Sequence, residues 1–297
     1  MNTEPAVLPP PVGPGDRVGV AALSGPVDEE RLEGGLAALR RMGFEPVVAD
    51  NAGARHGLFA GTDAERLAGF HRLAADPTIA AIFFTRGGHG VLRLLPAIDW
   101  ELLARRPRAY VGYSDLTPFL LGVVQRLGLV AFHGPMVGAD LARGLAPDDE
   151  ASLLAALAGR YPVTQRLDAA VRGDGTVAGP LLGGCLSLLV ATLGTDFFPD
   201  LAGSILFWED VGEPPYRIDR MLTHLRLSGN LARLQGMIVG HLDGGDDGLR
   251  EIVADALAGL PWPIAWGQPS GHRAPNRTLP LGLPARLSAG AAELVLG

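Results

Sequence analysis

A serine lies where an apolar segment gives way to a helical one. Residues 108–113 predict a strand, residues 116–127 predict a helix, and Ser114 and Asp115 lie between them. At the carboxyl end of a strand the hydroxyl is exposed where open α/β sheets bind ligands, and the helix N–H groups could stabilise an oxyanion. Leu116 stands where a G-x-S-x-G nucleophile elbow has its second glycine. The local pattern alone therefore favours a serine that only caps the helix over a nucleophile.

Glycines follow the most apolar of the expected strands. Residues 79–85 (IAAIFFT) predict a strand buried on both faces, and residues 86–90 (RGGHG) come directly after it. Glycines at this position let backbone N–H groups approach a ligand, so the segment is compatible with a phosphate cradle, an oxyanion hole or a tight turn. Neither this segment nor the turn at 24–26 has the G-x-G-x-x-G pattern, which argues against a dinucleotide site.

Two further segments carry groups that could work with a serine. The strand expected at 204–208 ends on Glu209 and Asp210, and carboxylates there either form a solvated rim or orient a histidine. His272 lies in a loop among Gly, Pro and Asn residues, which suits a catalytic histidine. The other six histidines have no Cys or carboxylate at metal-ligand spacing, so we expect no metal site.

The elements that must position these residues form two groups. In the first group, strands at 17–22, 45–49, 79–85, 108–113 and 129–132 alternate with helices at 28–42, 62–75 and 116–127, and a further helix is expected at 140–159. This alternation predicts a doubly wound, mostly parallel α/β domain at 15–145. After a linker at 146–165, we expect a smaller mixed α+β domain at 166–297. A Pro-rich leader occupies residues 1–14.

The composition excludes several classes of function. All 25 basic residues of this 297-residue chain are Arg, so it can form no lysine Schiff base and no P-loop lysine contact. The single Cys excludes an internal disulfide, and the net charge of −7 argues against nucleic-acid or anionic-membrane partners. The uncharged stretch at 175–195 contains Pro and several Gly, which favours a buried strand, turn and helix over a membrane span. No targeting signal precedes the first strand, and we expect a cytoplasmic protein.

Taken together, these segments resemble the LD-carboxypeptidase family of serine peptidases. The family includes the muramoyltetrapeptide carboxypeptidases and the microcin C self-immunity peptidases. The motifs that carry the resemblance span nearly the whole chain from residue 15: 15–26 (GDRVGVAALSGP), 86–90 (RGGHG), 112–115 (GYSD), 179–184 (GPLLGG), 208–220 (WEDVGEPPYRIDR) and 271–272 (GH). The resemblance implies an N-terminal α/β domain and a C-terminal domain built around a barrel-like sheet.

The resemblance also implies a Ser–His–Glu triad. Ser114 would be the nucleophile, His272 the general base and Glu209 the residue that orients His272. These three residues come from both expected domains, so the site would form at their interface. The backbone N–H of Asp115 and one from the glycine turn, that of Gly88, would form the oxyanion hole.

By the same resemblance the enzyme needs no cofactor and no metal. It would release terminal D-Ala from a peptidoglycan tetrapeptide as a homodimer, and Arg86, Gly87 and Tyr216 are the candidate substrate-binding residues. Arg86 is the candidate cation for a substrate carboxylate. His89 and Cys185 stand where the family has an aromatic residue and Asn, which leaves the substrate preference open.

Two other functions stay open at this point. An immunity-type peptidase would hydrolyse a peptidyl or aminoacyl nucleotide. A binding protein on the same fold would be inactive, although the chain retains all three residues of the implied triad.

Overall fold

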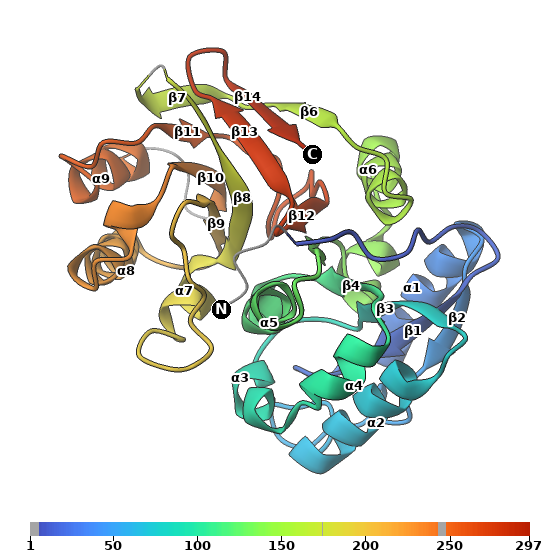
Figure 1. Cartoon of the computed structure of the whole chain (residues 1–297). Helices are drawn as coiled ribbons and strands as arrows, with labels where there is room; N and C mark the ends of the chain where they lie inside the picture. The colour runs from blue at the N-terminus through green and yellow to red at the C-terminus, as the bar shows by residue number, and fades with distance from the viewer. Residues whose placement is uncertain (1–5, 174, 243–247) are drawn as a thin grey trace.

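Two mixed β-sheets, each with helices packed on it, make up the molecule (Figure 1). The computed structural model describes residues 6–173, 175–242 and 248–297. The α/β fold with a second, curled sheet agrees with the predicted fold class.

The first sheet has the strand order β12-β5-β4-β3-β1-β2. Strands β1 to β5 are parallel, and β12 joins β5 antiparallel. Their bounds are β1 (Arg17–Ala21), β2 (Glu45–Val48), β3 (Ile79–Phe84), β4 (Ala109–Gly112), β5 (Ala131–His133) and β12 (Leu279–Leu281). The strand order reverses between β1 and β3, and ligands of such sheets bind outside the carboxyl ends of the strands at that point.

Helices cover both faces of this sheet, as predicted for a doubly wound domain. One face packs against α1 (Glu29–Arg41) and α6 (Pro147–Leu157), and the other against α2 (Asp63–Ala75), α3 (Val91–Leu94), α4 (Trp100–Arg105) and α5 (Thr117–Leu127). Thr62 caps α2, and the Glu65 side chain accepts the Thr62 N–H in return. A Thr followed three residues later by a Glu is the sequence pattern of a capping box.

The helix predicted at 140–159 is wrong in its first part. Residues 137–141 form one π-helical turn, η3 (Val137–Leu141), and α6 begins only at Pro147. The Asp140 carboxylate turns back to accept the Met136 N–H at 3.0 Å, and Gly144 has a φ of 85°. A positive φ ends the turn, and Pro147 starts a new helix because its ring is suited to the first position.

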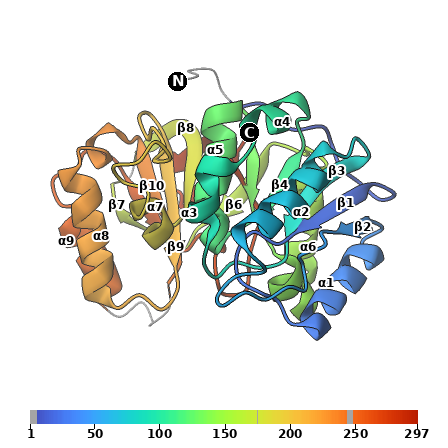
Figure 2. The same cartoon turned by 90° about the horizontal axis from the view of Figure 1, so that it is seen from below.

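The second sheet has the order β6-β14-β13-β8-β9-β10-β11-β7. Its central strands β8 to β11 are parallel, and antiparallel strands flank them on both sides. The bounds are β6 (Val163–Arg166), β7 (Ala169–Arg172), β8 (Thr176–Cys185), β9 (Ile205–Asp210), β10 (Gly236–Leu242), β11 (Ile264–Trp266), β13 (Pro284–Ser288) and β14 (Glu293–Leu296). Helices α8 (Pro215–Leu227) and α9 (Leu249–Ala256) lie side by side on its outer side (Figures 1 and 2).

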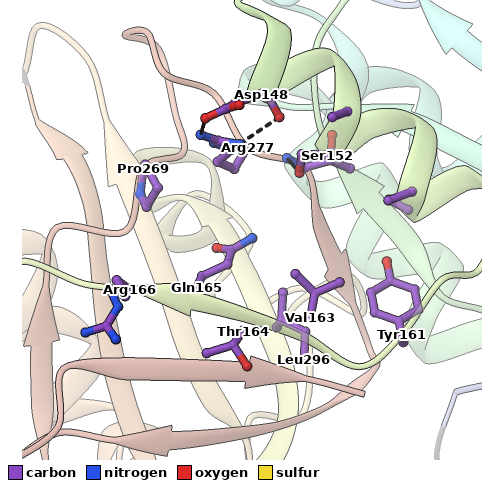
Figure 3. A pocket seen from close by; sticks show the side chains of 14 residues that line it. Asp148, Ser152, Tyr161, Val163, Thr164, Gln165, Arg166, Pro269, Arg277 and Leu296 are labelled. Atoms are coloured by element: carbon purple, nitrogen blue, oxygen red, sulfur yellow. Dashed lines mark hydrogen bonds and ion pairs between the residues drawn. The ribbon is translucent and has the colours of Figure 1, made fainter.

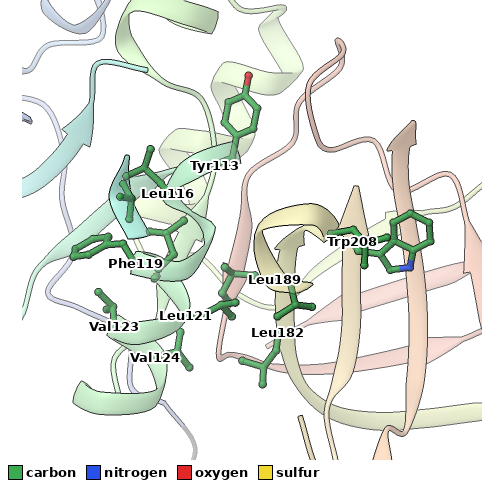
Figure 4. Packing of buried hydrophobic residues seen from close by; sticks show 14 of the residues in the cluster. Tyr113, Leu116, Phe119, Leu121, Val123, Val124, Leu182, Leu189 and Trp208 are labelled. Carbon is green, nitrogen blue, oxygen red and sulfur yellow. The ribbon is translucent and has the colours of Figure 1, made fainter. Parts of the chain in front are cut away.

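The contact between α5 and the second sheet is largely apolar and includes the buried hydrogen bond from the Cys185 N–H to Thr117 Oγ1 at 3.0 Å. Leu121 and Val124 of α5 face Leu182 of β8 and Leu189 of the short helix α7 (Leu186–Val190), as Figure 4 shows. The uncharged stretch at 175–195 is therefore a strand followed by a helix, as predicted. Among the described residues, no helix is long and apolar enough to span a membrane.

Some elements pass between the halves, so the domain boundaries stay a prediction. Strand β6 lies inside the expected linker and pairs in the second sheet, whereas β12 returns from the expected second domain to the first sheet. The described part of the leader runs along the first half: Val7 donates its N–H to Gly128, and Val12 donates to Leu157.

Candidate active site

Ser114 lies in a strained turn at the end of β4. It opens the short 3-10 turn η2 (Ser114–Leu116) with a φ of 60°, directly before α5. A non-glycine residue in the left-handed region costs energy that the surrounding structure must supply, and such strain is frequent at functional sites. No side-chain hydrogen bond caps α5 or η2. The local prediction that Ser114 caps the helix is therefore wrong.

The three residues of the implied triad meet between the two sheets. His272 Nε2 lies 2.9 Å from Ser114 Oγ, and His272 Nδ1 lies 2.7 Å from Glu209 Oε2. The carboxylate accepts the Nδ1 proton, so Nε2 carries the lone pair that can accept the serine proton. This order of contacts is the one that nucleophilic catalysis by serine requires.

Two glycines make room for the Glu209 carboxylate. A Cβ at Gly271 would lie 2.7 Å from Glu209 Oε2, and a Cβ at Gly240 would lie 3.1 Å from Glu209 Cβ. The first distance is too short for a side chain at Gly271, and a Cβ at Gly240 would also lie 2.7 Å from the Ser270 carbonyl oxygen. The β9 end and the His272 loop therefore approach this closely because neither glycine has a side chain. The His272 backbone N–H also donates to Glu209 Oε2, at 3.2 Å. Loop and strand are thus joined through backbone and side chain together.

Burial and charge act in opposite directions on this pair. Burial raises the pKa of the fully buried Glu209, and the hydrogen bond from His272 acts against that rise without cancelling it. Burial lowers the pKa of His272. The hydrogen bond and charge of Glu209, together with the charges of Asp210 and Asp140, more than offset this effect, so the pKa of His272 lies above its usual value. The sequence could not tell which of the two effects is larger.

The neighbouring carboxylates are used elsewhere. Asp210 accepts the Ser187 N–H at 2.7 Å, and Glu213 forms an ion pair with Arg217 at 3.0 Å. Of the three carboxylates that follow Trp208, Glu209 is the one that meets His272.

Glycine also brings the 86–90 turn against the serine. A Cβ at Gly87 would lie 2.8 Å from Ser114 Cβ and 2.9 Å from Ser114 Oγ, whereas a Cβ at Gly88 would meet Gly25. The Asp115 carboxylate accepts hydrogen bonds from Ser24 Oγ at 2.7 Å and from Val91 N at 3.0 Å. Because these bonds fix Asp115, its backbone N–H is held beside Ser114.

The other candidate residues lie in different surroundings. Arg86 is exposed and donates to the Pro26 carbonyl at 3.3 Å, and Tyr216 is 60% exposed beneath the Arg220 guanidinium. His89 lies against the Phe59 ring, and Cys185 is buried with its sulfur 3.5 Å from Asp210. Burial raises the pKa of the Cys185 thiol well above its usual value, so this cysteine stays a neutral thiol.

Sequence reasoning missed an acidic and aromatic group beside His272. The Tyr113 ring lies edge-on to the His272 ring at 5.0 Å, and its hydroxyl lies 3.3 Å from Asp140. His133 packs against Tyr113 and is fully buried, and burial lowers its pKa to about 3, so its ring is neutral. Tyr113 precedes the serine in the quoted motif, but the sequence gives no signal that Asp140 would reach it.

Two cavities adjoin the loop that carries His272. One of about 400 Å³ is lined by His272 together with residues of the 140–149 segment and the 272–276 loop. The other, of about 430 Å³, lies between α6, β6 and β14 on the far side of this loop and contains no triad residue (Figure 3). There Asp148 and Arg277 form an ion pair at 2.9 Å. Of these two cavities, only the first is lined by a residue of the triad, His272.

Comparisons with known proteins agree on one family. Residues 18–134 match the family model described as the LD-carboxypeptidase N-terminal domain, and residues 178–287 match the LD-carboxypeptidase C-terminal domain. A putative carboxypeptidase of Streptomyces coelicolor is 41% identical, over 98% of this chain and 96% of that protein. The murein tetrapeptide carboxypeptidase of Pseudomonas aeruginosa is 35% identical, over 91% and 92%.

A solved structure extends the similarity to a protein that binds a different kind of ligand. The structure of MccF in complex with glutamyl sulfamoyl guanosine superposes with a TM-score of 0.89 at 26% identity, over 97% of this chain and 98% of that one. MccF is the microcin C7 self-immunity protein of Escherichia coli.

Proposed function

Because the chain belongs to the LD-carboxypeptidase family of serine peptidases, we propose that it releases the C-terminal D-Ala of a murein tetrapeptide through Ser114, His272 and Glu209. That the protein is a peptidase, and a carboxypeptidase, follows from the family. The residues, the tetrapeptide and a role in peptidoglycan recycling belong to the proposal. The observation that carries it is the continuous line of hydrogen bonds from Ser114 Oγ through the His272 ring to Glu209.

In the first step Ser114 Oγ attacks the carbonyl carbon of the scissile bond. His272 Nε2, at 2.9 Å, takes the hydroxyl proton, and Glu209 stabilises the imidazolium through the 2.7 Å contact to Nδ1. Negative charge moves to the carbonyl oxygen. The proposed donors to this oxygen are the backbone N–H of Asp115 in η2 and that of Gly88, which follows the glycine that approaches Ser114 Oγ.

In the second step the imidazolium returns its proton to the leaving nitrogen. The C–N bond breaks, free D-Ala departs, and an ester to Ser114 remains. Water then attacks this ester while His272 accepts its proton. The serine is restored and the shortened peptide leaves with a new carboxylate. Every proton moves between substrate, water, Ser114 and His272, so the cycle needs no other reactant.

A second candidate function rests on the similarity to MccF. An enzyme of that kind would cleave an aminoacyl nucleotide with the same three residues, and the MccF structure holds an aminoacyl nucleotide analogue. We place this second, because the two curated relatives reported above are carboxypeptidases, one of them a murein tetrapeptide carboxypeptidase.

One panel of substrates tests both candidates. Purified protein is incubated with murein tri-, tetra- and pentapeptides and with an aminoacyl sulfamoyl adenosine, and free D-Ala and free nucleoside are measured separately. D-Ala released from the tetrapeptide alone supports the proposal. Nucleoside release without D-Ala release would replace it with the second function.

A serine-directed fluorophosphonate distinguishes an enzyme from an inactive binding protein on this fold. The wild type should be labelled, and Ser114→Ala should be unlabelled yet folded, with turnover reduced by several orders of magnitude because the activated nucleophile is gone. Ser114→Ala that kept more than a small fraction of the activity would contradict the serine mechanism.

The remaining parts of the proposal concern substrate contacts, assembly and location. Arg86, Gly87 and Tyr216 stay candidates for binding the peptide, and the family relationship suggests a homodimer in the cytoplasm. Light scattering of the purified protein measures the first of these two properties, and fractionation of the source cells measures the second.

A further inference from the structure

Catalysis by His272 fixes the side of the serine on which the leaving residue must lie. The imidazolium gives its proton to the leaving nitrogen, so this nitrogen must come within hydrogen-bond reach of His272 Nε2. The carboxylate carbon of a terminal residue lies only two bonds, about 2.5 Å, from that nitrogen. A cation that binds the terminal carboxylate is therefore expected close to the His272 ring.

A cavity lined by His272 fits this requirement. The cavity of about 400 Å³ beside His272 is walled by the 272–276 loop on one side and by the segment around η3 and the start of α6 on the other. Two cations, Arg143 and Arg273, are among the residues that line it. Arg86 is not among them; it lies over the Gly25 and Gly88 backbone on the side of the 86–90 turn.

Of the two cations, Arg143 has more of its hydrogen-bonding capacity available. Its Nε–H donates to the Ala139 carbonyl at 2.9 Å, and its Nη2 lies 3.5 Å from Asp140. A guanidinium carries five N–H donors, and the described contacts of Arg143 use only some of them. Its remaining N–H groups can therefore bind a carboxylate. Arg273 instead turns its Nη1 to the Leu242 carbonyl at the end of β10.

The two acids that line the cavity are held by other groups. Asp149 pairs with Arg277 at 3.2 Å and accepts the Asn276 N–H at 3.2 Å. Asp140 accepts the Met136 N–H at 3.0 Å and lies 3.3 Å from the Tyr113 hydroxyl. Because these contacts occupy both carboxylates, neither acid fully neutralises the charge of Arg143.

We propose that this cavity holds the leaving residue and that Arg143 binds its terminal carboxylate. The inference rests on the proposed function and adds the group that restricts cleavage to the end of a peptide. A substrate without a free carboxylate beside the scissile bond would lack this contact. Selection would then depend on charge, because a cavity of this size also has room for leaving residues larger than alanine.

The test pairs a change in the enzyme with a change in the substrate. Murein tetrapeptide ending in D-Ala and the same peptide ending in D-Ala amide are compared with wild type, Arg143→Met and Arg143→Lys. A charge-assisted hydrogen bond corresponds to a gain of about tenfold or more in affinity. Because the Arg143 side chain is 65% exposed and water screens its charge, we expect a gain of about tenfold. We expect wild type to prefer the acid by about tenfold in kcat/KM, Arg143→Met to lose this preference, and Arg143→Lys to keep part of it.

A matched control and a binding experiment complete the design. Like Arg143, Arg105 is an exposed arginine beside an acid, 3.7 Å from Glu101, but it lines neither cavity, so Arg105→Met should keep the full preference for the acid. Calorimetric titration of both peptides into Ser114→Ala, with and without Arg143→Met, reads the same preference without turnover. Added salt should weaken the preference because the cation is exposed.

The results separate the inference from the function on which it rests. If Arg143→Met cleaves and binds the acid and the amide with the wild-type ratio, the inference is wrong, and loss of the ratio in Arg86→Met or Arg273→Met would move the carboxylate site to that residue. If wild type releases no D-Ala while the binding preference still depends on Arg143, the proposed function fails and the carboxylate site stands. Neither turnover nor binding of either peptide would overturn both.

Discussion

Replacing Glu209 with Gln tests the electrostatic part of the triad most directly. Gln keeps the volume of the side chain and removes its charge. The Oε2 position is 2.7 Å from His272 Nδ1 and 3.2 Å from the His272 N–H, so an amide oxygen there could still accept both bonds. Any loss of catalytic rate should therefore come from the missing negative charge and from a change in the His272 tautomer, and not from a cavity left by a smaller side chain.

The expected size of the effect follows from burial. Glu209 is fully buried, so its charge acts on the imidazolium with little screening by water. Neutralising the acid of a comparable serine triad lowers kcat by about 10⁴, and we expect a loss of about 10³ to 10⁴ here. Without the Glu209 charge, burial is opposed mainly by the charges of Asp210 and Asp140, so the pKa of His272 should fall. The acid limb of kcat/KM should therefore move to lower pH than in the wild type.

A pH profile separates the two consequences. On the alkaline plateau His272 is neutral in both enzymes, so the rate deficit that remains there reports orientation and imidazolium stabilisation. The Gln amide nitrogen would occupy the Oε1 position, which has no hydrogen-bond partner among the described residues, so we expect a loss of about 1–3 kcal/mol in unfolding free energy. Urea denaturation measures that loss and shows that the variant is folded.

The matched control is Glu213→Gln, a carboxylate four residues further along the chain that pairs with Arg217 instead of His272. It should leave kcat and the acid limb unchanged. A plateau kcat for Glu209→Gln within about tenfold of wild type, or an acid limb that stays in place, would refute the role assigned to Glu209.

Two further predictions concern the same group of residues. Gly271→Ala would place a Cβ 2.7 Å from Glu209 Oε2 at a φ of 130°, so we expect at least a hundredfold loss of kcat and lower stability, measured by D-Ala release and thermal unfolding; wild-type values for both would contradict the close approach. In the wild type, the acid limb of kcat/KM should have its midpoint above pH 6.5, because the pKa of His272 is raised and the base must be neutral to act. Excess chelator should not change this profile, and activity that is lost on chelation and restored by zinc would contradict the mechanism.

The regular elements could be predicted because their signals are local. Strand β3 is a continuous apolar run, and the capping box at Thr62 lies within four residues. The π-helical turn at 137–141 could not be predicted, because it depends on the Asp140 side chain accepting a backbone N–H instead of pointing to solvent. Polar residues that compete with the backbone in this way give the same sequence pattern as a helix.

The candidate site, in contrast, could not be predicted from local signals. Local reasoning at Ser114 favoured a helix cap, because a positive φ at a serine leaves no trace in the sequence. Only the order of motifs along the chain placed Ser114, Glu209 and His272 together. The role of Gly87 beside Ser114 was equally hidden, since a pair of glycines does not reveal which of them a neighbouring atom approaches.

A closed ring of contacts joins the two sheets around the triad. Replacing the Thr117 hydroxyl removes one contact of this ring. The Ser114 carbonyl accepts the Thr117 N–H, and Thr117 Oγ1 accepts the Cys185 N–H at 3.0 Å. Cys185 of β8 pairs in register with Glu209 of β9. Glu209 in turn holds His272 against Ser114, which closes the ring. Thr117→Val keeps the shape and removes only the acceptor, so the Cys185 N–H is left unpaired. Because a displacement of about 1 Å can cost a hundredfold in rate, we expect kcat to fall by about tenfold to a hundredfold with KM little changed. Thr192→Val, which removes another buried threonine hydrogen bond outside the ring, should lower stability alone. If both variants lose stability equally and neither loses kcat, the ring does not position the triad.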